Sequence, residues 1–253
     1  MNFPVFTLAN AFGQITVTAY GGQLLSWKTA DGNEQLYTPD PLRMQPGRAL
    51  RGGVPVCFPQ FSGRGVLPKH GLVRTKAWQL RAKTDSALIL AICDDAETRA
   101  QWPYAFELIQ TLVLDAGGLS IALDFHNRSA LPLVFTAALH TYLRVDDVTQ
   151  CALQGLDGCD YEDAADGGRY KTQHGALRIH GEVDRVFADA PDSLLLQRGG
   201  KPDMRIAQGG FADTVVWCPG PDIAAAFPDM PAADWRHMLC VEAAAAAPPV
   251  TVL

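Results

Sequence analysis

The sequence predicts an all-β protein, a large and mostly antiparallel β-sandwich with few short helices. Three observations support this: alternating apolar and polar stretches recur along the chain, turn-forming residues separate them, and helical periodicity is scarce. The length of 253 residues exceeds that of an average domain, but undivided sandwiches and barrels often reach it. Because no internal repeat, linker or low-complexity boundary interrupts the chain, we expect a single domain over residues 1–253.

The first half of the chain begins with alternating stretches that predict strands. Residues 14–20 alternate as Q-I-T-V-T-A-Y, and residues 23–28 follow a Gly-Gly turn. Residues 78–83 and 87–93 are two further apolar runs, joined around a Thr-Asp-Ser turn. These spacings indicate short neighbouring strands joined by turns.

The middle of the chain contains the strongest hairpin signal. Residues 106–114 and 119–126 flank Asp-Ala-Gly-Gly at 115–118, a turn sequence between two alternating runs. Within the second run every other residue is apolar, which predicts one face against the core and one outward. The apolar run 133–139 continues the series as another strand.

Helices are expected to be few. Residues 94–101 predict one turn of helix before Trp-Pro, and residues 155–181 are rich in Gly, Asp and Tyr, as in loops between short strands. A final strand is expected near Val241. The alanine run 243–247 need not be a helix, because it ends in two prolines.

Composition and charge exclude several classes of function. The net charge is −6 and the pI about 5.4, which argues against a basic nucleic-acid-binding surface. We expect no membrane association, because no window approaches the roughly 20 apolar residues that span a bilayer. With no recognisable signal peptide and six scattered cysteines, we expect a cytoplasmic protein with reduced thiols.

Polar side chains gather in a few segments where a β core would not need them. These segments are residues 51–60, 69–74, 140–142, 182–187 and 240–242. Taken singly, each also has a structural interpretation, such as a surface ion pair, a turn glycine or a histidine buried for packing. Spacing alone leaves the site open, because residues far apart in sequence meet only through the fold.

Together and in this order, these segments resemble the aldose 1-epimerase superfamily, and specifically its hexose-6-phosphate 1-epimerase branch. The matching stretches are R-G-G-V-P-V-C-F-P-Q-F at 51–61, H-G-L-V-R at 70–74, L-S-I-A-L-D-F-H-N at 119–127, A-L-H-T-Y-L at 138–143, V-D-R-V-F at 183–187 and C-V-E-A at 240–243. The resemblance extends from about Gly21 to the C-terminus.

The resemblance implies a galactose mutarotase-like sandwich whose concave face holds a sugar. The implied reaction exchanges the α and β anomers of a phosphorylated aldohexose through its open-chain aldehyde, and it requires no metal and no cofactor. The implied partner is a small-molecule sugar phosphate, and family members can be monomeric.

The resemblance also implies roles for individual residues. Glu242 would be the catalytic base and His140 the catalytic acid, with the carboxylate expected to favour the protonated imidazole. His70 and Asp184 would contact the sugar.

The remaining implied contacts concern the phosphate and the wall of the site. Arg51 and Arg74 would bind the phosphate, since a guanidinium can donate two hydrogen bonds to one anion. Gln60 would line the site.

Some positions depart from the family pattern. Cys218 and Gly220 stand where family members often carry an asparagine and an aromatic residue, and Phe58 stands where a tryptophan is common. These departures leave the choice of sugar open.

Three alternative functions remain. A mutarotase for free aldoses would not need Arg51 and Arg74, and a non-catalytic carbohydrate-binding module would have little reason to retain both His140 and Glu242. A glycoside hydrolase would need two flanking carboxylates, which Asp184 and Glu242 could supply, but the histidine would then be unexplained.

Overall fold

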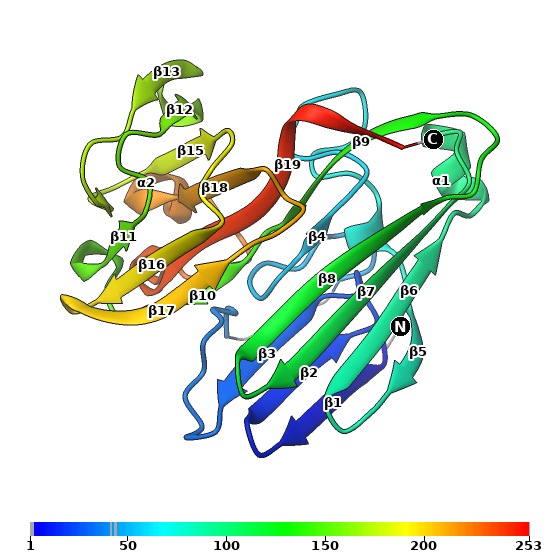
Figure 1. Cartoon of the computed structure of the whole chain (residues 1–253), viewed down its shortest axis with the longest axis horizontal. Coiled ribbons are helices and arrows are strands. Elements are labelled where there is room, and N and C mark those ends of the chain that lie inside the picture. The colour runs from blue at the N-terminus through cyan, green and yellow to red at the C-terminus, as the bar shows by residue number, and fades with distance from the viewer. Residues whose placement is uncertain (1–2, 41, 43–44, 253) are drawn as a thin grey trace.

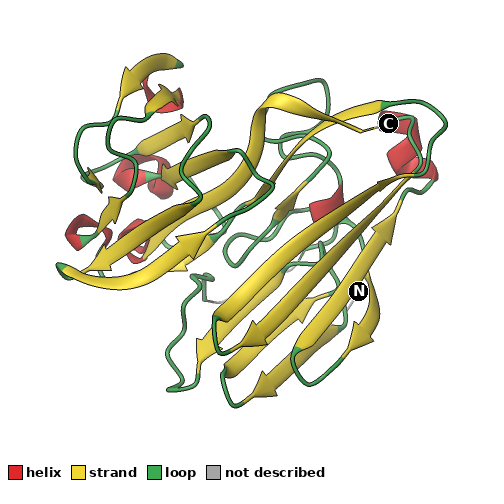
Figure 2. Cartoon of the chain, in the orientation of Figure 1, coloured by secondary structure: helices red, strands yellow, loops and turns green. Residues whose placement is uncertain are grey.

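The computed structural model describes residues 3–40, 42 and 45–252, and it consists of antiparallel sheets with few short helices. Strands dominate the whole molecule, and the helices are short segments at the ends of the sheets (Figure 2). This architecture confirms the predicted all-β fold class. In the described part of the chain, no helix is long and apolar enough to cross a membrane.

Two smaller sheets pack together at one end of the molecule, at the lower right of Figure 1, where the N-terminus also lies. The first contains β1 (Val5–Asn10), β2 (Gly13–Thr18) and β3 (Leu24–Thr29). The second contains β5 (Gln79–Lys83), β6 (Ala87–Cys93), β7 (Phe106–Asp115) and β8 (Gly118–Asn127), in that order. The hairpin predicted around residues 115–118 is confirmed by the pairing of β7 with β8.

The central sheet is the largest, with the strand order β13-β12-β15-β18-β19-β9-β4 and with β10 paired to β19. Its strands are β4 (Val56–Cys57), β9 (Leu133–Leu139), β10 (Tyr142–Arg144), β12 (Asp160–Asp163), β13 (Arg169–Thr172), β15 (Val183–Phe187), β18 (Asp213–Cys218) and β19 (Met238–Val252). The alanine run 243–247 lies within β19, as a strand and not a helix. Figure 1 shows β19, in red, running between β18 and β9.

A fourth sheet lies beside the central one. It contains β14 (Leu177–Arg178), β11 (Ala152–Gln154), β16 (Ser193–Arg198) and β17 (Lys201–Ala207). The short strands β12, β13 and β14 all fall between residues 155 and 181, which confirms the expected alternation of loops and short strands there.

The helices close the ends of the sheets. They are α1 (Ala96–Gln101), α2 (Gly220–Ala225) and the 3-10 helices η1 (Val73–Thr75), η2 (Val148–Gln150), η3 (Ala164–Asp166) and η4 (Ala232–His237). The predicted helical turn at 94–101 is α1, and Asp95 caps it by accepting a hydrogen bond of 2.7 Å from the Thr98 N–H.

The apolar core joins the sheets. One cluster of buried residues includes side chains from Leu8 in β1 to Val241 in β19. Phe58 lies at the centre of an aromatic group in it, with four ring centroids between 5.1 and 5.6 Å away; they belong to Trp102, Phe106, Phe125 and Phe135. Because Phe58 is only 1% exposed, its ring supports the loop that continues from β4 towards His70.

Candidate active site

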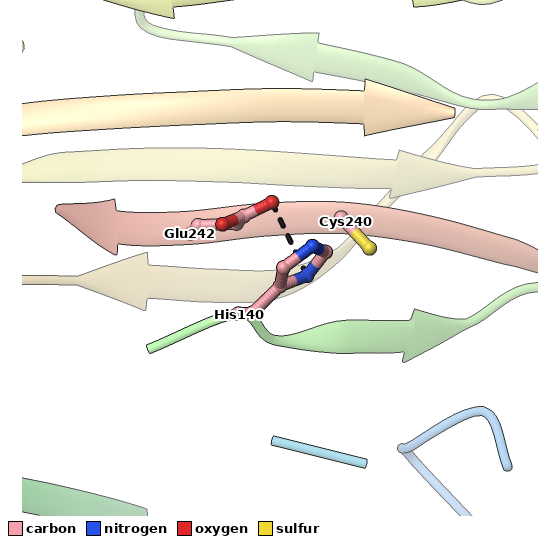
Figure 3. A group of neighbouring side chains, drawn as sticks. All are labelled: His140, Cys240 and Glu242. Carbon is pink, nitrogen blue, oxygen red and sulfur yellow. Dashed lines mark ion pairs between the residues drawn. The ribbon is translucent and has the colours of Figure 1, made fainter. Parts of the chain in front are cut away.

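The register of three strands places His140 directly opposite Glu242. Leu139, the last residue of β9, pairs with Ala243 in β19. Two residues later β10 begins, and its first residue, Tyr142, pairs with Cys240 in β19. His140 lies between the two paired segments, so the same register sets it against Glu242. Opposed side chains in antiparallel strands share one face of the sheet. Figure 3 shows both side chains, together with Cys240, on that face.

His140 and Glu242 are close and deeply buried. The His140 Nδ1 atom is 3.2 Å from the Glu242 Oε1 atom, and the two residues are 9% and 1% exposed. The contact has ion-pair distance but not the alignment of a hydrogen bond, because the Nδ1 atom has no hydrogen-bond partner. The second carboxylate oxygen, Oε2 of Glu242, is also buried without a partner. Both groups therefore have unused hydrogen-bonding capacity, which a bound polar molecule could satisfy.

Burial sets the charge state of this pair. Desolvation lowers the pKa of His140 well below its usual range, and the positive charges of Arg74 and Arg51 lower it further. Desolvation raises the pKa of Glu242 well above its usual range, and the nearby carboxyl group of Asp184 raises it further. The expectation that the carboxylate favours a protonated histidine is therefore wrong for the ligand-free site, because the cost of burying charge exceeds the attraction between the two groups.

His70 reaches the same face from the loop after β4. Its ring centroid is 5.3 Å from that of His140, and its backbone has the left-handed φ of 65°. A non-glycine residue in this conformation is strained and is held by its surroundings, here by a hydrogen bond of 2.9 Å from the His70 N–H to the Ser62 carbonyl oxygen.

The environment of His70 fixes its tautomer. The Ser62 N–H donates to His70 Nδ1 at 3.3 Å, and the Cys57 Sγ atom lies 3.2 Å from the same nitrogen. Nδ1 is therefore an acceptor, and the ring hydrogen is on Nε2. Burial lowers the pKa of His70 to about 3, so the ring is neutral and can only donate one hydrogen bond through Nε2.

Aromatic side chains to which the sequence analysis assigned no role form a wall beside His140. Tyr142 stacks on the His140 ring at 4.8 Å, and Trp217 meets the same ring edge-on at 5.8 Å. Phe227 extends the wall, with its centroid 6.3 Å from that of Trp217. Such a wall suits the apolar face of a sugar ring, while the polar residues face its hydroxyl groups.

Arg51 lies at the far end of this wall. Its Cζ atom is 3.8 Å from the centroid of the Phe227 ring, and its Nε donates to Asp229 Oδ1 at 2.9 Å. Stacking and the Nε contact orient the guanidinium, and its terminal nitrogens have no hydrogen-bond partner among the described residues. The backbone beside Arg51 requires glycine, because Gly53 has a φ of 60° and a Cβ there would collide with the Leu24 carbonyl oxygen.

Cavities lie on both sides of the central sheet. A small one of about 190 Å³ adjoins Arg51 and is lined by both Arg48 and Asp229, and the sequence did not point to Arg48. A larger one of about 840 Å³ lies on the opposite face of β19, against β8 and β17, and is lined mostly by apolar residues. The larger cavity is lined by none of the predicted site residues.

Arg74 and Asp184 lie near the pair without touching it. The Nη2 atom of Arg74 donates to the Lys69 carbonyl oxygen at 2.7 Å, and the charge of Arg74 lowers the pKa of both His70 and His140. Asp184 pairs with Trp217 across β15 and β18, which places the two side chains on the same face. Burial raises the pKa of the Asp184 carboxyl group.

Gln60 is fully occupied within its own loop. Its Nε2 donates to the carbonyl oxygens of Ser62 and Leu67 at 3.2 and 3.0 Å, and its Oε1 accepts from the Leu67 N–H at 2.9 Å. These contacts hold the loop that leads to His70.

The departures at 218 and 220 do not reach the face of His140. Trp217 is opposite Cys240 and shares its face, so Cys218 points to the other side of the sheet, where it is fully buried. Gly220 has a φ of 63°, and a Cβ there would meet the Glu182 backbone nitrogen at 2.5 Å. Both positions therefore shape the backbone behind the wall and not its surface.

The chain is similar to several known proteins. The family model described as Aldose 1-epimerase matches residues 4–253. A "Putative glucose-6-phosphate 1-epimerase" from Cenchrus ciliaris is 33% identical over an alignment of 247 residues that covers 92% of this chain and 75% of that protein. A protein of the same description from Escherichia coli strain K12 is 29% identical over 231 residues, covering 88% of this chain and 77% of its own.

Solved structures show the same fold. The crystal structure of a putative mutarotase from Salmonella typhimurium superposes with a TM-score of 0.90 at 26% identity, covering 99% of this chain and 86% of that one. A structure from Synechocystis superposes with a TM-score of 0.82 at 20% identity, covering 100% and 91%. The second similarity concerns the fold alone.

Proposed function

The chain belongs to the aldose 1-epimerase family, and on that premise we propose that it is a hexose-6-phosphate 1-epimerase, which exchanges the α and β anomers of a phosphorylated aldohexose. The observation that carries the proposal is the pair of His140 and Glu242, opposed on one face of the sheet with Nδ1 and Oε1 3.2 Å apart. A ring-opening reaction needs one group that takes a proton and one that gives a proton within reach of neighbouring sugar oxygens.

In the proposed reaction the proton that burial favours on Glu242 first passes to His140. Glu242 then takes the proton of the C1 hydroxyl group while His140 gives a proton to the ring oxygen. The bond between C1 and the ring oxygen breaks, the aldehyde rotates, and the ring closes on the other face as both transfers reverse. The opposed geometry supports these roles because it presents the two groups to adjacent atoms of one sugar.

Neighbouring residues are proposed to orient the sugar. His70, neutral and with its hydrogen on Nε2, would donate to a sugar oxygen, and Asp184 would accept from hydroxyl groups. The ring of Trp217 would pack against the apolar face of the sugar beside His140.

The phosphate is proposed to bind at Arg51 and Arg74, with Arg48 at the edge of the adjoining cavity. Arg51 supports this because Asp229 and Phe227 orient its guanidinium while its terminal nitrogens stay available. The names of the curated relatives also refer to glucose 6-phosphate.

Phosphate binding would also prepare the acid. The charges of Arg74 and Arg51 lower the pKa of His140, and a bound phosphate dianion would offset both charges. The pKa of His140 would then rise on binding a phosphorylated sugar, which increases the protonated fraction that the reaction requires. A neutral sugar would not have this effect.

We further propose that the protein acts as a cytoplasmic, single-domain monomer on a small-molecule sugar phosphate. One core cluster extends from β1 to β19, which supports a single domain. The proposal includes no nucleic-acid partner and no membrane partner.

The direct test is anomer exchange of glucose 6-phosphate followed by ³¹P magnetisation-transfer NMR. The wild type is expected to exchange the two anomer signals faster than buffer alone, and His140→Ala is expected to lose most of this rate while still binding the sugar phosphate. If the wild type and His140→Ala both match the buffer rate, the enzymatic proposal is wrong, although a carbohydrate-binding module would survive.

A further inference from the structure

A third side chain with metal-binding chemistry lies beside the proposed acid and base. An imidazole nitrogen of His140, the Sγ atom of Cys240 and a carboxylate oxygen of Glu242 all lie within 4.8 Å of one another, and all three residues are buried. Figure 3 shows the three side chains converging on the same face, Cys240 and Glu242 from β19 and His140 from the end of β9. The proposed anomer exchange assigns no role to Cys240.

Two atoms of this cluster are buried without a hydrogen-bond partner. These are His140 Nδ1 and Glu242 Oε2, in residues that are 9% and 1% exposed. A buried polar atom without a partner costs stability, so a bound species that satisfies it is favoured. Both atoms are of the types that coordinate divalent transition metals.

We propose that His140, Cys240 and Glu242 form a binding site for Zn²⁺ or a similar borderline-soft divalent cation, and that the bound ion inhibits the enzyme. Imidazole, thiolate and carboxylate are the side chains that Zn²⁺ selects, and three of them leave a fourth position for water. A hard cation such as Mg²⁺ would be disfavoured, because it prefers oxygen ligands.

The distances require only a small movement. Tetrahedral Zn²⁺ with typical bond lengths separates a nitrogen ligand from an oxygen ligand by about 3.4 Å and from a sulfur ligand by about 3.5 Å. The nitrogen and oxygen of His140 and Glu242 are already 3.2 Å apart. The Sγ atom of Cys240 lies within 4.8 Å of both, so a shift of at most about 1.3 Å towards them would complete the set.

Charge also favours the ion. A thiolate, a carboxylate and a neutral imidazole around Zn²⁺ have no net charge, which lowers the cost of burial. Entry remains open through His140, whose side chain is 11% exposed. The inhibition rests on the proposed function, because the ion would occupy the atoms that transfer the protons. The binding of the ion does not depend on that function.

The test uses Co²⁺, which takes the place of Zn²⁺ and reports its ligands in the absorption spectrum. Chelator-treated wild type titrated with Co²⁺ is expected to give a thiolate-to-cobalt charge-transfer band that Zn²⁺ abolishes. Cys240→Ser is expected to lose the band and to weaken Zn²⁺ binding by about 100-fold or more, since even indirect partners of a metal ligand contribute about 10- to 100-fold.

Two controls separate this site from other thiols. Cys218→Ser removes a fully buried thiol from the opposite face of the same sheet, and Cys93→Ser removes the exposed one, so both variants should retain the band. Cys240→Ala provides a second replacement if the serine variant does not fold.

Activity completes the test. Micromolar Zn²⁺ is expected to stop anomer exchange in the wild type, EDTA to restore it, and the metal-free Cys240→Ser enzyme to work without this sensitivity. No charge-transfer band in the wild type, or an unchanged band in both Cys240 variants, would overturn the metal site. A band without any anomer exchange in the metal-free wild type would instead leave the site standing and refute the proposed function.

Discussion

Replacing Arg51 should separate phosphorylated from free sugars. Arg51→Ala removes a side chain that is only 17% exposed and whose Cζ atom lies 3.8 Å from the centroid of the Phe227 ring. A hydrogen bond from a charged group contributes about 1.5–3 kcal/mol. At about 1.4 kcal/mol per tenfold change, kcat/KM for glucose 6-phosphate should fall about 10- to 100-fold. For free glucose, which has no phosphate, it should change little.

The change should act on the substrate and not on the fold. The partner of Arg51 is Asp229, whose side chain is 36% exposed, so water can solvate it when the ion pair is lost. An ion pair with one solvated partner contributes about 1 kcal/mol and the contact with Phe227 about 0.5–1 kcal/mol, so the unfolding midpoint should fall only modestly. Arg51→Lys provides a matched variant that keeps the positive charge but loses the planar guanidinium group. Its kcat/KM for glucose 6-phosphate should lie between those of the wild type and Arg51→Ala.

The assay compares two substrates on the same enzyme preparations. ³¹P magnetisation transfer measures the exchange of glucose 6-phosphate anomers, and ¹H magnetisation transfer measures that of glucose. An equal loss for both sugars would refute the phosphate role of Arg51 and favour a mutarotase for free aldoses. Loss of the native circular dichroism spectrum would show that the residue supports the fold instead.

Three further variants test other parts of the molecule. Glu242→Gln keeps the volume of a residue that is 1% exposed, so exchange should fall about 10²- to 10⁴-fold with unchanged binding by calorimetry, while the exposed Glu182→Gln should not slow it. The pKa of His70 falls from 6.5 to about 3 on folding, so the unfolded state binds the extra proton and stability declines as the pH drops below 6.5. Between pH 7 and pH 5 the free energy of unfolding of the wild type, measured by urea titration, should fall by about 2 kcal/mol more than that of His70→Gln. The same fall in both proteins would contradict this. Phe58→Ala should cost about 3–5 kcal/mol in the same titrations, whereas Val66→Ala, at a fully exposed position, should be neutral.

Most of the fold could be predicted where strands alternate or where turn residues are distinctive. The runs 87–93 and 133–139 have the bounds of β6 and β9, and the Asp-Ala-Gly-Gly turn fixed the hairpin of β7 and β8. The strand β18 was not predicted, because it is buried on both faces and therefore shows no alternation.

The candidate site was predicted only in part. The resemblance pointed to His140, Glu242 and His70, which the structure brings together. It assigned no role to Trp217, whose position beside His140 depends on the register of β18 against β19. It also led to the wrong charge state for His140, because pairwise chemistry is visible in a sequence and the depth of burial is not.

β9 and β10 pair with β19 in one continuous register, although residues 140 and 141 separate them, and this has a consequence for how the protein can evolve. The proposed acid and base belong to opposed strands of the central sheet, whereas Arg51 and His70 stand on loops outside it. Insertions in those loops can alter which sugar is recognised and leave the proton-transfer geometry intact. A single-residue insertion in β19 would instead turn Glu242 to the opposite side of the sheet. Substrate range and reaction type can therefore diverge independently within one scaffold.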